Sequence, residues 1–210
     1  MLYVIARAIL RVVLKIAFKT QIEGEGNIPS EGPVILVANH LSMLDPIVLG
    51  CAVSRPVRFM AKHELFSNRL FARVLESLGA FPVRRGQADR EAFHKALEVL
   101  SRGQVLGVFP EGTRSLTGQL QAPYSGAVVL AEKTGAPIVP VGIVGTDRIL
   151  RKGAVVPKPG RISVRIGRPI YPSSPSQGQA REGERGAVDL KSVMMQHIAE
   201  LIAGGARATR

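Results

Sequence analysis

The stretch that decides the fold is Pro33-Val34-Ile35-Leu36-Val37-Ala38-Asn39, a continuous apolar run that ends in a polar residue. A strand covered on one face alternates apolar and polar side chains, whereas a strand covered on both faces stays apolar throughout. The run therefore predicts a buried strand of a parallel sheet. Further buried strands are expected at 105–109 and 137–144, where the sequence has the same character.

Helical segments alternate with these strands. We expect helices near 43–53, 66–77, 87–102 and 125–134, and shorter strands at 57–61, 81–83 and 161–167. The last strand, RISVRIG, alternates as a half-exposed strand does. Strands alternating with helices over about 150 residues predict an α/β fold, a single domain with a mostly parallel central sheet flanked by helices. We assign this domain to residues 21–171.

The N-terminal segment, 1–20, has a different pattern. Residues 2–19 contain no Gly, Pro, Asp or Glu, and the cations Arg7, Arg11, Lys15 and Lys19 recur every fourth residue. On a helix these cations form one slanting stripe. Because they interrupt the apolar run, a signal peptide and a spanning helix both fit poorly. The pattern favours an amphipathic helix at a membrane interface, and a core-packed amphipathic helix is the alternative.

The C-terminal part has two segments. Residues 172–187 hold Ser, Pro, Gly, Gln and charges with almost nothing to bury, which predicts a flexible linker. Residues 188–210 form a C-terminal helix and tail, and we expect the helix to end at 203 with the last seven residues frayed.

Composition restricts the partners. The 210 residues include 28 Lys and Arg against 16 Asp and Glu, a formal net charge of +12, which attracts polyanions. Aromatic residues make up only 5%, which argues against nucleic acid as a partner. The single cysteine, Cys51, excludes a disulfide scaffold and a cysteine-based metal site, and its apolar neighbours predict a packed core thiol. The four histidines are scattered, so we expect no metal.

One candidate site is Asn39-His40-Leu41-Ser42-Met43-Leu44-Asp45. His40 directly follows the buried strand, at the edge where open α/β sheets place their sites. Asp45 falls in the first turn of the next helix, from which its carboxylate can fold back onto the imidazole. Such a pair fixes the tautomer and raises the basicity of the other ring nitrogen. Taken alone, a loop histidine beside an aspartate that the helix dipole stabilises is the commoner reading.

Two further segments carry charged groups at strand ends. In Phe109-Pro110-Glu111-Gly112-Thr113-Arg114-Ser115, a tight turn brings Glu111 and Arg114 to the end of the 105–109 strand, and Gly112 permits close approach of a ligand. In Gly79-Ala80-Phe81-Pro82-Val83-Arg84-Arg85-Gly86, two arginines follow a short strand. Arginine suits bidentate phosphate recognition. A surface salt bridge and a solvated arginine pair are the simpler readings of the two segments.

Taken together, these segments resemble the glycerolipid acyltransferase family typified by 1-acyl-sn-glycerol-3-phosphate acyltransferase. The family's blocks occur in order, as Asn39-His40…Asp45, Gly79…Arg85, Phe109–Ser115 and Val139-Pro140-Val141, and Lys62-His63-Glu64-Leu65 is similar to a further segment. The resemblance covers roughly residues 34–145.

The resemblance implies roles for individual residues. His40 would take the proton from the acceptor hydroxyl, Asp45 would orient His40, and the hydroxyl would attack an acyl thioester directly. Arg85 and Arg114 would hold the acceptor phosphate, and Glu111 would contact the glycerol backbone. Gly112 and Thr113 would belong to the same substrate-binding turn, with a backbone N–H near Gly112 as an oxyanion donor.

The resemblance also implies the activity: transfer of a fatty acyl group to the sn-2 hydroxyl of 1-acylglycerol 3-phosphate (lysophosphatidate), giving phosphatidic acid. Within the family, glycerol 3-phosphate or another lysolipid is the alternative acceptor. From another class, a non-catalytic basic membrane-binding protein is the alternative. No cofactor is implied; the donor substrate would be acyl-CoA or acyl-carrier protein. The other expected partner is an anionic membrane surface, with peripheral, monotopic attachment at the cytoplasmic face of the cell membrane.

Overall fold

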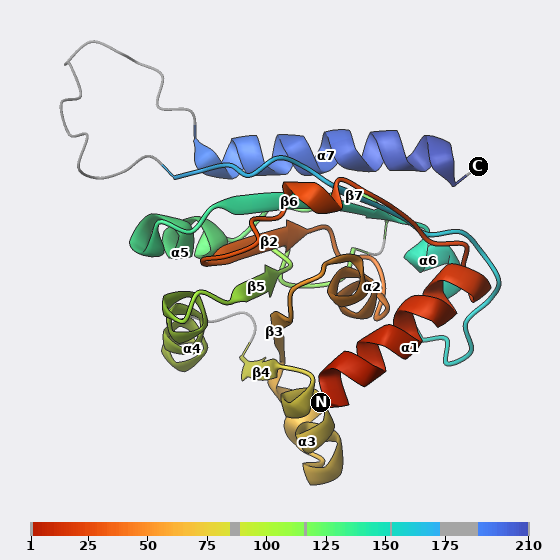
Figure 1. Ribbon diagram of the computed structural model, residues 1–210, viewed down its shortest axis with the longest axis horizontal. Coiled ribbons are helices and arrows are strands. Elements are labelled where there is room, and N and C mark those ends of the chain that lie inside the picture. Colours follow the sequence, from red (N-terminus) through yellow and green to blue (C-terminus); the bar gives the residue numbers. More distant parts are fainter. Residues whose placement is uncertain (1, 85–88, 116, 152, 173–188, 210) are drawn as a thin grey trace.

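A seven-stranded sheet forms the centre of the protein (Figure 1). The computed structural model describes residues 2–84, 89–115, 117–151, 153–172 and 189–209. Within them the strands are β1 (Gln21–Glu23), β2 (Val34–Ala38), β3 (Val57–Lys62), β4 (Ala80–Val83), β5 (Val105–Val108), β6 (Ile138–Val144) and β7 (Ser163–Ile166). Their order across the sheet is β1-β7-β6-β2-β5-β3-β4. All neighbouring strands are parallel except β6 and β7.

Helices cover both faces of this sheet. They are α1 (Leu2–Ala17), α2 (Asp45–Ala52), α3 (Arg69–Ser77), α4 (Arg90–Ser101), α5 (Gly126–Thr134), α6 (Thr146–Ile149) and α7 (Leu190–Ala208), with short 3₁₀ turns η1 (Glu25–Asn27) and η2 (His63–Phe66). Helices α4, α5 and α7 pack on one face. On the other face α2 packs on the sheet, and α1 packs on α2 (Figure 1). The predicted single α/β domain with a mostly parallel sheet is confirmed.

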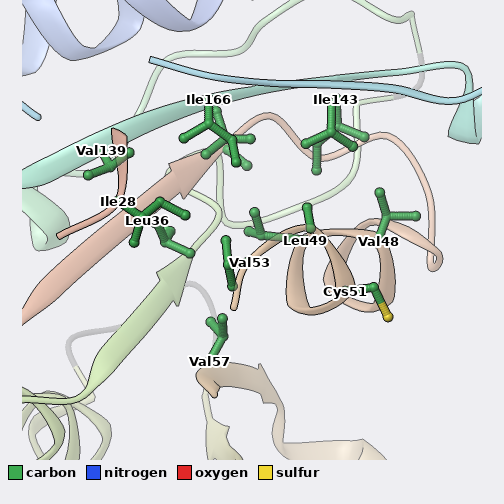
Figure 2. Close-up of a cluster of buried hydrophobic side chains, with 14 of the residues drawn as sticks. Ile28, Leu36, Val48, Leu49, Cys51, Val53, Val57, Val139, Ile143 and Ile166 are labelled. Carbon is green, nitrogen blue, oxygen red and sulfur yellow. The ribbon is translucent and has the colours of Figure 1, made fainter. Parts of the chain in front are cut away.

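Strand β2 lies in the middle of the sheet, and its side chains alternate between the two cores. Val34, Leu36 and Ala38 belong to the cluster under α2, part of which Figure 2 shows, whereas Ile35 and Val37 belong to the cluster under α4, α5 and α7. Both faces are therefore dry, and all five residues are fully buried. This double burial is the physical reason for the uninterrupted apolar run.

Strand β7 differs from its sequence prediction at one position, Ser163. Its pattern indicated a half-exposed strand, and Val164 and Ile166 are buried while Arg165 is partly exposed, but Ser163, on the same face as Arg165, is buried as well. The strand lies between β6 and the short edge strand β1, which the sequence did not predict, and α7 covers it. The polar residue at 163 is buried because a helix packs over this part of the sheet.

The two ends of the chain also differ in detail from the expectations. Helix α7 continues to Ala208 instead of ending at 203, because it packs along β6 and β7. Residues 173–188, which include nearly all of the predicted linker, lie outside the described residues.

The N-terminal segment is helical in α1, its expected contact with a membrane stays a prediction, and part of its basic stripe contacts the protein. Arg7 donates to the carbonyl of Ser54, and Arg11 pairs with Glu25 at 3.1 Å. Leu14 packs into the core. No helix within the described part of the chain is long and apolar enough to span a membrane.

Candidate active site

The site begins where β2 ends, and Asn39 fixes this point. Its side-chain amide donates to the carbonyl of Ile143 at 2.9 Å and accepts from the amide of Ile143 at 2.8 Å. The β2–β6 ladder runs to Ala38 opposite Val141, so the Asn39 side chain continues the pairing for one more step. The next residue, His40, therefore leaves the sheet in a fixed direction.

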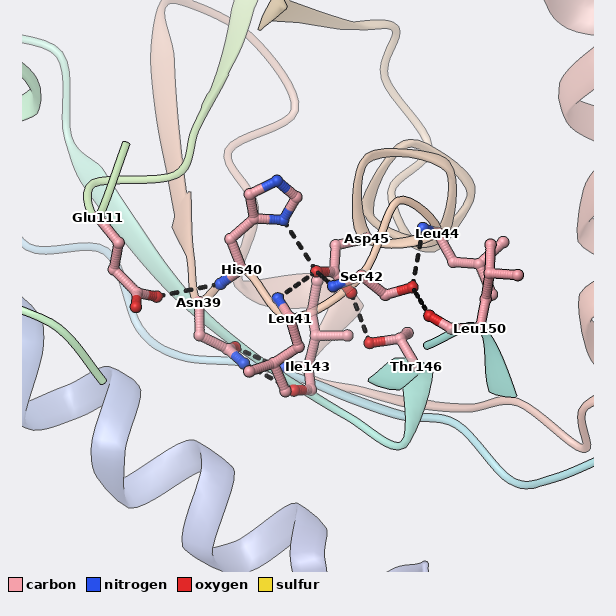
Figure 3. Close-up of polar contacts among 10 residues, drawn as sticks. All are labelled: Asn39, His40, Leu41, Ser42, Leu44, Asp45, Glu111, Ile143, Thr146 and Leu150. Atoms are coloured by element: carbon pink, nitrogen blue, oxygen red, sulfur yellow. Dashed lines mark hydrogen bonds and ion pairs between the residues drawn. The ribbon is translucent and has the colours of Figure 1, made fainter. Parts of the chain in front are cut away.

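His40 and Asp45 form the predicted pair. The distance from His40 Nδ1 to Asp45 Oδ2 is 2.9 Å, and Asp45 is fully buried at the start of α2 (Figure 3). The same oxygen accepts from the amides of Leu41 and Ser42, both at 2.6 Å. The other oxygen, Oδ1, accepts from Thr146 Oγ1 at 2.6 Å. These bonds fix the orientation of the carboxylate toward the imidazole.

The second nitrogen of the His40 ring is available for chemistry. An ionised carboxylate only accepts hydrogen bonds, so Nδ1 carries the hydrogen and a neutral ring presents its lone pair at Nε2. Nε2 makes no hydrogen bond within the described residues. Because no fully buried side-chain nitrogen or oxygen among them lacks a partner, Nε2 reaches solvent. The ring stacks on Phe109 with centroids 4.3 Å apart, which holds its plane.

Glu111 joins the two candidate loops. The residue is 3% exposed; Oε1 accepts from the backbone amide of His40 at 3.1 Å, and Oε2 accepts from the amide of Gln121 at 3.0 Å. Burial raises the pKa of this carboxyl, and the two N–H donors partly oppose that shift. The amide of Ser115 also donates to the carbonyl of His40 at 2.8 Å. The expected contact of Glu111 with glycerol stays a prediction; the contacts observed are with backbone.

The turn after Glu111 lines a groove of about 930 Å³. Gly112, Thr113 and Arg114 contribute to its wall, together with the cations Lys62 and Arg84. Arg114 is half-buried and forms no ion pair within the described residues, so its charge is available to an anion.

Gly112 has φ +67°, and a Cβ there would lie 2.7 Å from the Tyr124 ring. Its N–H donates to the carbonyl of Phe109 at 3.0 Å, which leaves the expected oxyanion donor to another group near this turn. Arg85, the other expected phosphate ligand, lies outside the described residues.

Sequence reasoning missed the residues that hold the His40 loop from β6 and α6. Thr146 is 101 residues from Asp45 in the sequence, and the hydroxyl of Ser42 donates to the carbonyl of Leu150 at 2.8 Å. Thr146 follows Gly145, whose φ of +96° marks a sharp turn at the end of β6. A glycine directly after a buried strand was the sequence signal for Thr146, because the carboxyl ends of parallel strands at one edge of the sheet meet at the site.

Two other expectations concern reactive groups. Cys51 is buried with a raised pKa caused mainly by burial, which confirms the packed core thiol. Among the described residues, no group of three or more His, Cys, Asp or Glu side chains is arranged to hold a metal ion.

A buried carboxylate that orients a histidine can make the ring's other nitrogen a base for a hydroxyl. His40 itself does not line the groove, but Phe109 and Glu111, which contact His40, do, together with Lys62, Arg84, Arg114 and the carboxylate of Asp89. A sequence profile of the family described as Acyltransferase matches residues 19–144. A chloroplastic 1-acyl-sn-glycerol-3-phosphate acyltransferase of Brassica napus is 32% identical over 160 residues, 74% of this chain and 46% of that protein. The 1-acyl-sn-glycerol-3-phosphate acyltransferase of Bacillus subtilis is 29% identical, over 77% of this chain and 79% of that protein.

A solved structure is also similar. The crystal structure of the 1-acyl-sn-glycerophosphate (LPA) acyltransferase PlsC from Thermotoga maritima matches with a TM-score of 0.75 and 28% identity, over 94% of this chain and 78% of that one. This chain belongs to the acyltransferase family. It spans about half the length of the chloroplastic relatives it matches.

Proposed function

We propose that this protein transfers a fatty acyl group from an acyl thioester to the sn-2 hydroxyl of 1-acylglycerol 3-phosphate, producing phosphatidic acid. The observation that carries the proposal is the buried His40–Asp45 pair, joined through Phe109 and Glu111 to a groove whose wall includes Lys62, Arg84 and Arg114. The names of the Brassica napus, Bacillus subtilis and Thermotoga maritima relatives support the acceptor.

The reaction follows from the geometry of the pair. His40 Nε2 takes the proton of the acceptor hydroxyl as its oxygen attacks the thioester carbonyl carbon. The resulting imidazolium is stabilised by Asp45, whose carboxylate lies 2.9 Å from Nδ1. When the tetrahedral intermediate collapses, the carbon–sulfur bond breaks, the imidazolium of His40 gives its proton to the sulfur, and the donor leaves as a thiol. No acyl-enzyme is needed.

The groove cations would bind the acceptor phosphate. Arg114 forms no ion pair with the described residues, and it follows Glu111, which ties its turn to the His40 backbone. A phosphate held by Arg114 would therefore lie at a fixed position relative to His40, and fixed relative position is what makes an intramolecular proton transfer fast. Arg85 would contribute a second guanidinium.

Membrane attachment would use α1. Its side chains Ile5, Ile9, Val12, Val13 and Ile16 are all exposed and lie on one side of the helix. The exposed Lys15 lies beside this apolar side, as in helices that rest in the headgroup region. We infer peripheral attachment, at the cytoplasmic face because the acyl donor is made there. Either donor, acyl-CoA or acyl-carrier protein, is an anion that the net charge of +12 attracts.

Thiol release from a long-chain acyl-CoA in the presence of vesicles and lysophosphatidate tests the proposal. The His40→Ala variant should lose about two to four powers of ten in rate. His94→Ala, which removes an exposed histidine on α4, is the matched control and should retain the wild-type rate.

Parallel assays with glycerol 3-phosphate and other lysolipids test the acceptor, and acyl-carrier protein replaces acyl-CoA to test the donor. A preference for another acceptor would overturn the substrate and retain the mechanism. Equal rates in wild type and His40→Ala would overturn the mechanism. Vesicle binding with no release from any acceptor would identify a non-catalytic membrane-binding protein.

A further inference from the structure

The loop of residues 153–161, between α6 and β7, exposes two adjacent valines. Val155 is 90% and Val156 is 76% exposed, and among the large hydrophobic residues of the described part of the chain Val155 is the most exposed. Pro157 and Pro159 follow, and they restrict the backbone of the loop. The loop therefore presents an apolar tip that a partner could cover.

The charges around this tip are all of one sign. The segment from Arg148 to Arg161 contains five Lys or Arg residues and no Asp or Glu. Those that the structure describes, Arg148, Arg151, Lys158 and Arg161, are exposed. An apolar tip with basic flanks is complementary to an anionic bilayer, where the tip enters the acyl boundary and the cations meet the headgroups.

The ends of the loop connect the candidate site to α1. At its start, the carbonyl of Leu150 accepts from Ser42 Oγ at 2.8 Å, within the loop that carries His40 and Asp45. At its end, the amide of Ile162 donates to the carbonyl of Phe18 at 3.1 Å, directly after α1. Figure 1 shows the loop in cyan beside α1. The exposed valines therefore lie within about six residues of two anchor points, Leu150, which is bonded to the loop of His40 and Asp45, and Ile162, which is bonded to the residue after α1.

We propose that the 153–161 loop is a second membrane contact, in which Val155 and Val156 insert into an anionic bilayer alongside α1. The inference rests on the proposed function, because a lipid acceptor requires a site near the interface. Contact at both α1 and the loop would bring the His40–Asp45 pair to the bilayer, since the loop joins the segment bonded to Ser42. A second copy of the chain is a poorer occupant, because two valines bury far less area than a stable protein interface of about 1,200–2,000 Å².

Co-sedimentation with vesicles of phosphatidylcholine, with and without phosphatidylglycerol, tests the loop. The Val155→Asp/Val156→Asp variant should lower the partition coefficient about tenfold or more, because two apolar groups are replaced by carboxylates that the anionic surface repels. Lys158→Gln/Arg161→Gln should weaken binding only to vesicles that contain phosphatidylglycerol.

Tyr171→Asp is the matched control. Tyr171 is exposed and follows Ile170, which pairs with Ile138 at the opposite end of β6 from the loop. The control should bind vesicles within about twofold of wild type. All variants should retain the wild-type rate on a short-chain, water-soluble lysophosphatidate, which shows that the fold and the chemistry are intact.

Wild-type vesicle binding by Val155→Asp/Val156→Asp would overturn the loop contact, as would a change in oligomeric state with vesicle binding unaltered. An equal loss in Tyr171→Asp would also overturn it, since any added negative charge would then suffice. Failure of the proposed function is a separate result: wild type would release no thiol with lysophosphatidate, whichever variants bind vesicles.

Discussion

Replacing Thr146 by valine removes one hydrogen bond from the candidate catalytic pair and almost nothing else. Valine has nearly the shape of threonine, and Thr146 is fully buried, so no cavity forms and no new group is exposed. What is lost is the bond from Thr146 Oγ1 to Asp45 Oδ1, 2.6 Å long. The oxygen Oδ1 is then left in a dry environment without that donor.

The magnitude follows from the contacts that remain. A hydrogen bond to an ionised group contributes about 1.5–3 kcal/mol. Asp45 Oδ2 keeps its bonds from His40, Leu41 and Ser42, so the carboxylate stays in position and we expect the lower part of that range. A loss of about 1.5–2 kcal/mol at the transition state lowers kcat about 10- to 30-fold. KM for lysophosphatidate should hardly change, because the Thr146 side chain hydrogen-bonds to Asp45 and does not line the groove proposed for the substrate.

The assay is thiol release at saturating acyl-CoA over a series of lysophosphatidate concentrations, with wild type, Thr146→Val and Thr146→Ser. The serine variant keeps the hydroxyl and loses the methyl, so it should recover most of the wild-type kcat. If serine were as slow as valine, the methyl packing would matter and the role assigned to the hydroxyl would be wrong. A wild-type kcat in Thr146→Val would refute the reasoning altogether.

Three further changes test the surroundings of the pair. Glu111→Gln removes a carboxyl whose pKa is raised in the folded protein. Such a group stabilises the fold fully at acid pH, and this contribution is lost as the pH rises through the folded-state pKa. In urea unfolding, the stability of wild type relative to this variant should therefore fall from acid to neutral pH. Asn39→Asp turns an oxygen toward the carbonyl of Ile143 and should lower the free energy of unfolding by about 1–3 kcal/mol. Gly145 has φ +96°, and a Cβ added there would lie 2.1 Å from the carbonyl oxygen of Arg161. Gly145→Ala should therefore lower the midpoint of thermal unfolding strongly.

Each of these has a control or a contradicting result. Gly153 has a similar φ of +86°, and a Cβ added there would have nothing within 4 Å. Gly153→Ala therefore measures only the free energy of holding an alanine at positive φ, about 1–2 kcal/mol. Equal effects of the two alanines would show that the carbonyl contact at Gly145 relaxes without cost. A pH-independent difference between wild type and Glu111→Gln would contradict the raised pKa. Unchanged stability in Asn39→Asp would mean that the Asn39 amide does not hold the end of β2.

The buried strand and the His40–Asp45 pair were predictable because both depend on short-range pattern. Five apolar residues in succession need cover on both faces, and β2 has it. Only four residues lie between His40 and Asp45, so one loop and one helical turn are enough to bring the imidazole and the carboxylate together, and they lie 2.9 Å apart. No distant part of the chain is required for either result.

What the sequence by itself determined is therefore the layered α/β fold and the residues that carry the candidate chemistry. Only the tertiary structure decided how those residues are held: Thr146 reaches Asp45 across 101 residues, and the Glu111 carboxylate binds the His40 backbone across 71. It also decided that Ser163 is buried and that Arg7 and Arg11 contact the protein. Local patterns record which face of an element is dry, whereas these contacts depend on which elements pack side by side, and that is set by the free energy of the whole core.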